Sequence, residues 1–184
     1  MRRILVLLMA IGLLLAGAAP ASSGPPEQGV RAGGAVGDVT ASIVRTSSGV
    51  SVQVHATGLN PGDAYTAWVF TFDDGDPTGM PDIAVNVAGH VVGASGNATF
   101  SGRVSAGFHA INGLTSINPM GNIGDMNFDF PMDAVVDVHI VNHGPAADYP
   151  QDTNCGLTNL NEAINTICGL DPPAHQVWRF DPTP

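Results

Sequence analysis

The sequence predicts an all-β fold: an antiparallel β-sandwich of about seven strands with one disulfide-stapled, partly helical excursion. The clearest sign is in residues 50–57, where Val50, Val52, Val54 and Ala56 alternate with polar side chains. This period of two indicates a strand with one buried and one solvated face. Turn-forming clusters of Gly, Asn, Pro and Asp recur roughly every ten residues, a spacing typical of sandwiches and barrels.

The other strands are predicted from β-branched and aromatic content between these turns. Residues 64–72 (AYTAWVFTF) are apolar on both faces, which is typical of a central strand. Residues 83–92 and 98–104 are expected to form a hairpin through the Gly-rich turn 93–97. The remaining predicted strands are 36–46, 134–142 and 174–180.

Two segments interrupt the strands. Residues 105–133 have no clear period, and a loop of that length usually has a function or is held by its own side chains. Phe108, Phe128 and Phe130 are candidates for holding it. The second segment is the excursion 144–173, in which residues 158–167 form the best helix candidate.

The first residues have the pattern of a cleavable signal peptide. Arg2 and Arg3 precede an apolar run, and Ala19-Pro20-Ala21 supplies the small-x-small cleavage pattern, so we expect cleavage after Ala21. The alternative is a permanent membrane anchor, which needs about 20 apolar residues, and this run ends earlier. The expected organisation is therefore a signal peptide (1–21), a flexible leader (22–35) and a single sandwich domain (36–184), secreted and without stable membrane insertion of the mature chain.

The charge balance restricts the possible partners. The chain has 6 Lys and Arg residues against 16 Asp and Glu residues, a formal net charge of −10. Phosphate recognition needs clustered Lys and Arg, so we expect no nucleic-acid partner. A protein or glycan partner remains open.

The two cysteines, Cys155 and Cys168, are expected to form a disulfide in an oxidising compartment. A loop of this size contributes on the order of 3 kcal/mol in the chain-entropy model. A catalytic thiol or half of a metal site are the alternatives, and no CxxC motif or adjacent His supports them.

Four histidines form a candidate metal site. If the strands 134–142 and 174–180 are antiparallel neighbours, His143 lies beside His175 at the neck of the excursion, and His139 or His90 could add a ligand for Zn or Cu. The alternatives are that these imidazoles hydrogen-bond the backbone at the base of the loop, or that they make the neck sensitive to pH.

An acidic turn is the second candidate site. Asp73, Asp74, Asp76 and Asp82 lie within ten residues, and an oxygen-rich extracellular loop can bind calcium weakly. The spacing is not that of an EF-hand, and Asp-Gly and Asp-Pro are also ordinary turn sequences. A solvated loop without a cation is therefore the alternative.

Catalytic motifs are absent from the sequence: there is no GxSxG, no HExxH and no glycine-rich phosphate loop. Trp68 and Trp178 could line a sugar-binding surface, although the strand pattern favours core positions. Residues 97–99 (NAT) form a formal glycosylation sequon.

Several short stretches are similar to those of a known group. They are 58–68 (GLNPGDAYTAW), 89–94 (GHVVGA), 98–100 (ATF), 138–139 (VH), 143–146 (HGPA) and 175–176 (HQ). Together they resemble small exported bacterial proteins for which a β-sandwich is expected and no activity is assigned. The resemblance implies an exported module with His90, His139, His143 and His175 in similar places. It departs at 73–77 (DDGDP), where Asn-Asn-Pro is expected. Copper-zinc superoxide dismutases are similar at the level of fold only, and their His-x-His motif is absent.

Two functional hypotheses follow from these observations. The first is an exported, non-enzymatic binding or structural module that works through its loops. The second is a metal-binding protein, possibly an enzyme, with Zn or Cu at the histidines or Ca at the acidic loop.

Overall fold

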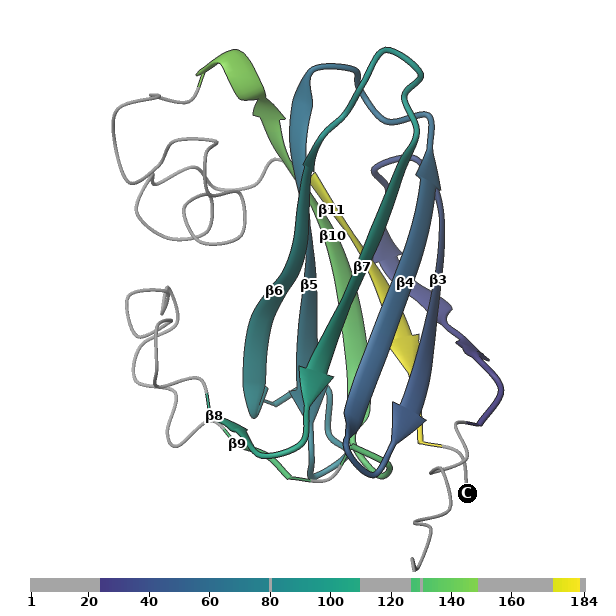
Figure 1. Ribbon diagram of the computed structural model, residues 1–184, viewed down its shortest axis with the longest axis vertical. Helices are drawn as coiled ribbons and strands as arrows, with labels where there is room; N and C mark the ends of the chain where they lie inside the picture. The colour runs from purple at the N-terminus through teal and green to yellow at the C-terminus, as the bar shows by residue number, and fades with distance from the viewer. Residues whose placement is uncertain (1–23, 80, 110–126, 130, 149–173, 183–184) are drawn as a thin grey trace, which may run out of the picture.

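The chain folds into two antiparallel β-sheets that pack face to face (Figure 1). The structure is a computed structural model and describes residues 24–79, 81–109, 127–129, 131–148 and 174–182. The four-stranded sheet has the order β1 (Glu27–Gln28), β3 (Asp38–Thr46), β4 (Gly49–Thr57) and β7 (Ala98–Ser105). The five-stranded sheet has the order β2 (Val30–Gly34), β11 (Ala174–Phe180), β10 (Val135–Pro145), β5 (Asp63–Phe72) and β6 (Ile83–Val91). The predicted all-β antiparallel sandwich is thus confirmed.

The core lies between the sheets and is built by alternating residues. Val50, Val52, Val54 and Ala56 of β4 are all buried, as the period of two predicts. Opposite them lie alternating apolar residues of β5 and β10. Because alternate side chains of a strand point to opposite faces, the polar residues between the buried ones lie on the outer face of each sheet.

The central-strand prediction for β5 is confirmed. It lies between β10 and β6, and eight of its ten residues are buried. Its outer face is partly buried as well, since Trp68 and Phe70 are half-buried there, which fits a sequence that is apolar at consecutive positions, without the alternation of β4.

The structure corrects the predicted flexible leader. Within 22–35, β1 pairs with β3 and β2 pairs with β11, so this segment adds an edge strand to each sheet. Gly29 connects the two strands beneath the Phe180 ring, where an added Cβ would lie 2.6 Å from Cζ. The Ser-, Gly- and Pro-rich composition suggested flexibility, and it does not reveal the pairing with β3 and with the distant strand β11.

The predicted hairpin between residues 83–92 and 98–104, which form β6 and β7, is wrong. β6 pairs with β5 and β7 pairs with β4, so residues 92–97 carry the chain from one sheet to the other. The Val92 amide donates to the Asp63 carbonyl at 2.9 Å, and the Leu59 amide donates to the Gly96 carbonyl at 3.0 Å. These bonds hold the crossing segment against the loop before β5.

The long segment 105–133 is described in part. Its ends form a short ladder, β8 (Phe108–His109) with β9 (Asn127–Phe128), in which Phe108 lies opposite Phe128. Phe128 is fully buried and Phe108 packs against the core, so the prediction that aromatic side chains hold this segment is confirmed for these two. Residues 110–126 and Phe130 lie outside the described residues.

Much of the predicted excursion also lies outside the described residues. The strand β10 continues through Gly144, whose φ is +83°, to Pro145, and a short 3-10 helix, η2 (Ala146–Asp148), follows. Residues 149–173, with Cys155, Cys168 and the predicted helix, are not described, so the disulfide remains a prediction. Among the described residues, no helix is long and apolar enough to cross a membrane.

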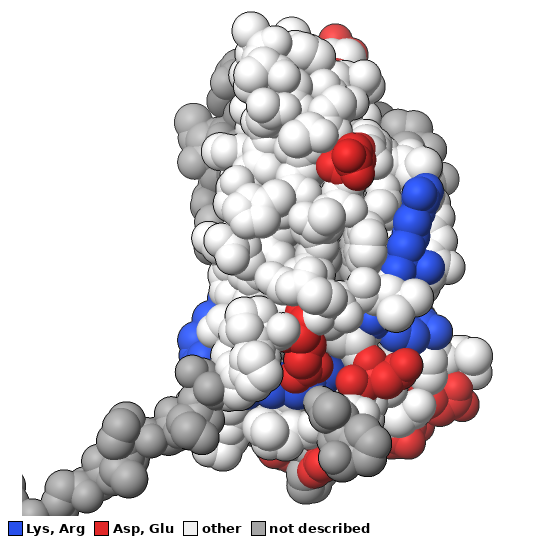
Figure 2. All heavy atoms as spheres, turned by 90° about the vertical axis from the view of Figure 1, so that its right-hand side faces the viewer, with Lys and Arg blue, Asp and Glu red and all other residues white. Residues whose placement is uncertain are grey.

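The charges visible on one side of the molecule are unevenly distributed. In the view of Figure 2, charged side chains gather toward the lower end, and the upper part is mostly uncharged. The described ion pairs are Arg45–Glu27 and Arg179–Asp137, at 3.0 and 2.7 Å.

Candidate functional site

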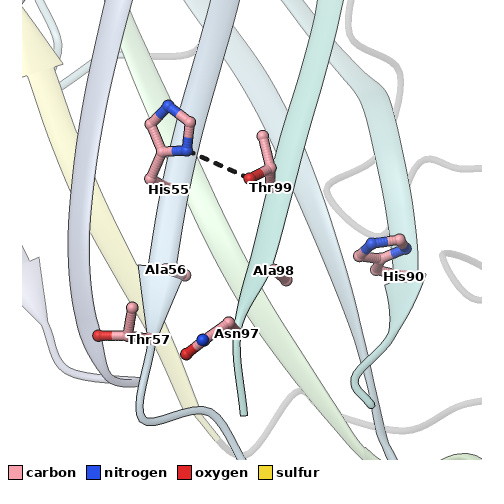
Figure 3. A pocket seen from close by; sticks show the side chains of 7 residues that line it. All are labelled: His55, Ala56, Thr57, His90, Asn97, Ala98 and Thr99. Carbon is pink, nitrogen blue, oxygen red and sulfur yellow. Dashed lines mark hydrogen bonds between the residues drawn. The ribbon is translucent and has the colours of Figure 1, made fainter. Parts of the chain in front are cut away.

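A hollow of about 450 Å³ lies where β4, β7 and β6 meet (Figure 3). We call it the groove, and its lining residues are His55, Ala56, Thr57, His90, Asn97, Ala98 and Thr99. His55, Thr57 and Thr99 are exposed on the outer face of the four-stranded sheet, and Asn97 lies just before β7. The two alanines are buried, so the polar side chains stand above a floor that packs into the core.

Strand pairing positions the groove residues. His55 of β4 lies directly opposite Thr99 of β7, and its Nδ1 is 3.2 Å from the Thr99 Oγ1. His90 comes from β6, the edge strand of the other sheet, and its ring meets Phe100 edge-on with centroids 5.8 Å apart. The groove therefore spans the edge of the sandwich and is formed by both sheets.

The lining residues offer neutral hydrogen-bonding groups. Two threonine hydroxyls, an amide and two imidazoles can each donate and accept hydrogen bonds. The lining includes no carboxylate, Lys or Arg. This donor set suits an uncharged polar ligand better than a metal cation, which prefers carboxylates or converging imidazoles, or an anion, which prefers Arg and Lys.

The histidines of the predicted metal site are distributed over the structure. β10 and β11 are antiparallel neighbours, as expected, but the ladder pairs His175 with Val141, and Asn142 with Ala174. His143 lies beyond the last described pair, so the expected direct pairing of His143 with His175 is two positions out of register. The His175 side chain is outside the described part of the structure.

His143 is buried and bonds to a neighbouring strand. Its Nε2 lies 2.7 Å from the Oγ1 of Thr66, which accepts a hydrogen bond from the Trp68 indole at 3.0 Å. Burial lowers the pKa of His143 to about 4, so this imidazole is neutral at pH 7. His139 lies four residues earlier, with its ring 4.3 Å from that of Phe70. His90 lies on β6, which β5 separates from β10, and it lines the groove.

The acidic turn uses most of its carboxylates within its own loop, and Asp73 Oδ2 also accepts from the backbone amide of Asp129 at 3.4 Å. Asp82 Oδ2 accepts from the Asp73 amide, and Asp74 Oδ1 accepts from the Asp76 amide. Asp76 Oδ1 accepts from both the hydroxyl and the amide of Thr78, and these bonds lower the pKa of Asp76. These hydrogen bonds fit the alternative to a calcium site, which is a solvated loop without a cation.

No set of three or more His, Cys, Asp or Glu side chains in the described part of the chain is arranged to hold a metal ion. Because Cys155, Cys168 and the His175 side chain are not described, the histidine metal site stays a prediction. The calcium loop also stays a prediction.

The two tryptophans have different environments. Trp178 packs against the core, and its buried Nε1 has no hydrogen-bond partner among the described residues. Trp68 is half-buried on the outer face of the five-stranded sheet, beside Phe70 at a centroid distance of 6.2 Å. The prediction that the tryptophans occupy core positions therefore fits Trp178 better than Trp68.

Sequence reasoning did not find the groove. The sequence did contain two indications of it. The alternation in 50–57 places His55 and Thr57 on the outer face, and the sequon brings Asn97 and Thr99 within two residues of each other. The missing step was the pairing of β4 with β7, which the predicted hairpin excluded. Neither a protein-family model, nor a curated protein, nor a solved structure matches this chain.

Proposed function

We propose that this protein is an exported, non-enzymatic binding domain that takes its ligand in the groove. The observation that carries the proposal is the convergence of neutral polar side chains from β4, β7 and β6 on one hollow. All of these side chains except Asn97 are carried by strands of the core, so the site is largely preformed and binding requires little ordering.

The lining chemistry supports binding rather than catalysis. His55 and Thr99 are within hydrogen-bond distance, but activation of a threonine also needs a group that orients the histidine. Among the groove's lining residues no carboxylate is available for that role. A hydrogen-bonding recognition site is therefore the simpler reading of this pair.

Export is the second part of the proposal and rests on residues 1–21. Mass spectrometry of the secreted protein should give an N-terminus at Ser22. Retention of Arg2 and Arg3 in the mature protein would contradict export through a cleaved signal peptide.

The groove is tested by NMR titration of residues 22–184 with four probes: a neutral β-glucan hexasaccharide, inorganic phosphate, Zn²⁺ and an uncharged peptide. We expect at least one of the two neutral probes, the hexasaccharide or the peptide, to shift the amide signals of 55–57 and 97–99, and expect Asn97→Ala/Thr99→Val to abolish the shifts. Shifts with phosphate or Zn²⁺ alone would contradict an uncharged ligand. Thr78→Ala, an exposed threonine in the acidic turn, is the matched control. Shifts that map elsewhere, or no shifts with any probe, would overturn the proposal.

The metal content of the same protein, residues 22–184, distinguishes the groove-binding domain from the metal-binding alternative. Elemental analysis after tag-free purification gives a metal content near zero for a groove-binding domain. Near-stoichiometric Zn or Cu that is lost in His143→Ala/His175→Ala would favour the histidine site instead, and calcium would favour Asp73, Asp74 and Asp76.

A further inference from the structure

The groove is one end of a larger uncharged surface. We define the polar face as the outward residues of β3, β4 and β7, which the strand registers arrange in rows. One row is Thr40, His55 and Thr99, and the next is Ser42, Gln53 and Ser101. All six side chains are exposed or half-buried, and the residues between them along each strand are buried.

Charged residues occur only at the two ends of this face. Asp38 begins β3 opposite Thr57, and Arg103 ends the face beside Ser51, where its guanidinium donates to the Ser51 and Ser48 hydroxyls at 3.0 and 2.8 Å. The two rows between them carry no Asp, Glu, Lys or Arg.

The chemistry of the face excludes several classes of occupant. Nucleic acids require Lys and Arg, and metal cations prefer carboxylates or converging imidazoles, whereas His55 is the single imidazole in the two rows. Protein interfaces are enriched in aromatic residues, Met and Arg and depleted in Ser. Hydroxyls, an amide and an imidazole, which both donate and accept, match a ligand whose own surface consists of hydroxyl groups.

The spacing of the face favours an extended ligand with a repeat. Neighbouring strands lie about 4.8 Å apart and same-face residues about 6.6 Å apart along a strand, so the rows form a flat lattice of hydrogen-bonding groups. A neutral polysaccharide presents hydroxyls at regular intervals along its length, and many weak contacts along one chain add through multivalency.

We propose that the polar face and the groove together bind a neutral polysaccharide, which enters the groove at His55 and Thr99 and crosses the rows of β3, β4 and β7. This inference rests on the proposed binding function of the groove and names its ligand class. The side chains of Gln53 and Ser101 would contact the polymer at the centre of the face.

The test is co-sedimentation of residues 22–184 with insoluble cellulose, chitin and xylan. The variant Ser42→Ala/Gln53→Ala/Ser101→Ala removes the central row, whose exposed or half-buried positions tolerate substitution. We expect binding to at least one polymer and a loss of at least about tenfold in this variant, as for several lost hydrogen bonds. Thr78→Ala, in the acidic turn, should bind like the wild type.

The outcomes separate this inference from the proposed function. Binding that the triple variant retains would overturn the polar face as the site. Absence of binding to all three polymers, with a non-saccharide probe still shifting 55–57 and 97–99, would overturn the polysaccharide and leave the groove as a binding site. Absence of both signals would overturn both proposals.

Discussion

The Nε2 atom of His143 lies 2.7 Å from the Thr66 hydroxyl, and this bond joins the end of β10 to the outer face of β5. The Trp68 indole can only donate, so the Thr66 oxygen accepts from it at 3.0 Å and can give its own hydrogen to Nε2. A neutral imidazole with Nε2 as acceptor fits this arrangement, and protonation of Nε2 would break it.

The first prediction concerns the pH dependence of stability. The pKa of His143 is about 4 in the folded protein and 6.5 in the unfolded chain, so the unfolded chain binds the additional proton between these values. The free energy of unfolding should therefore fall as the pH drops from about 6.5 to 4, by about 3 kcal/mol from this group. Urea titrations over this range measure the slope.

The variant His143→Gln should lose this slope relative to the wild type. His55→Gln, at an exposed histidine on β4, is the control and should keep it. An unchanged slope in His143→Gln would show that other groups cause the pH dependence.

The second prediction concerns Arg45, whose side chain is only 4% exposed. Its guanidinium donates to Glu27 and to the carbonyls of Ala134 and Phe180, at 2.6 and 3.0 Å for the carbonyls. It thus joins β1, the start of β10 and the end of β11. Arg45→Met should lower the free energy of unfolding by about 3 kcal/mol or more, because the buried carbonyls of Pro131, Ala134 and Phe180 lose their partner.

Glu27→Gln supplies the comparison for Arg45. The Glu27 side chain is 24% exposed, so its loss of charge should cost about 1 kcal/mol or less. Equal losses in the two variants, measured by urea unfolding, would place the whole effect in the ion pair and contradict a role for the carbonyl bonds.

These contacts show which parts of the fold the sequence predicts. The alternation in β4 and the apolar run of β5 are local patterns, and both strands form as predicted. Partner choice is not local: β7 follows β6 in sequence but pairs with β4, because residues 92–97 bond to the loop before β5. The segment 27–34 gains its structure from β3 and β11, which its own composition does not reveal.

The candidate site was missed for the same physical reason. The sequence identified His90 and the 97–99 sequon separately, whereas the groove exists only because β4 and β7 are neighbours and β6 adjoins them. A displaced register likewise separates His143 from His175: the ladder between β10 and β11 ends at Asn142 and Ala174 among the described residues. An error of one or two residues in the register is small along the sequence, but it changes which side chains lie beside each other.

The third prediction concerns the buried polar cluster of Tyr65 and Asn142. The Asn142 amide donates to both the Tyr65 hydroxyl and Asp63 Oδ2, each at 3.0 Å, and the Asn60 amide donates to the same hydroxyl at 3.2 Å. Tyr65→Phe removes the acceptor of the buried Asn142 side-chain amide and of the part-buried Asn60 backbone amide, and should cost about 1 to 3 kcal/mol.

A double-mutant cycle tests the Tyr65–Asn142 contact directly. Because Asn142→Ala removes the same hydrogen bond, the double variant should lose less stability than the sum of the single variants, by at least about 0.5 kcal/mol. Strict additivity would mean that the two groups do not interact. Burial also raises the pKa of Tyr65, so its phenolate absorbance should develop above the ordinary pH range for tyrosine.

The last prediction concerns the closure of the sandwich beside the groove. A Cβ atom on Gly102 of β7 would lie 2.6 Å from the Val87 Cβ and 2.7 Å from the Val87 carbonyl oxygen of β6. Since part of this clash is with backbone, Gly102→Ala should separate the two edge strands and cost about 1 to 3 kcal/mol.

Gly93→Ala is the matched control, because an added Cβ there has no neighbour within 4 Å. If the groove depends on this close approach, Gly102→Ala should also weaken probe binding in NMR titrations while Gly93→Ala does not. Equal stability of the two variants would show that β6 and β7 are free to move apart at this edge.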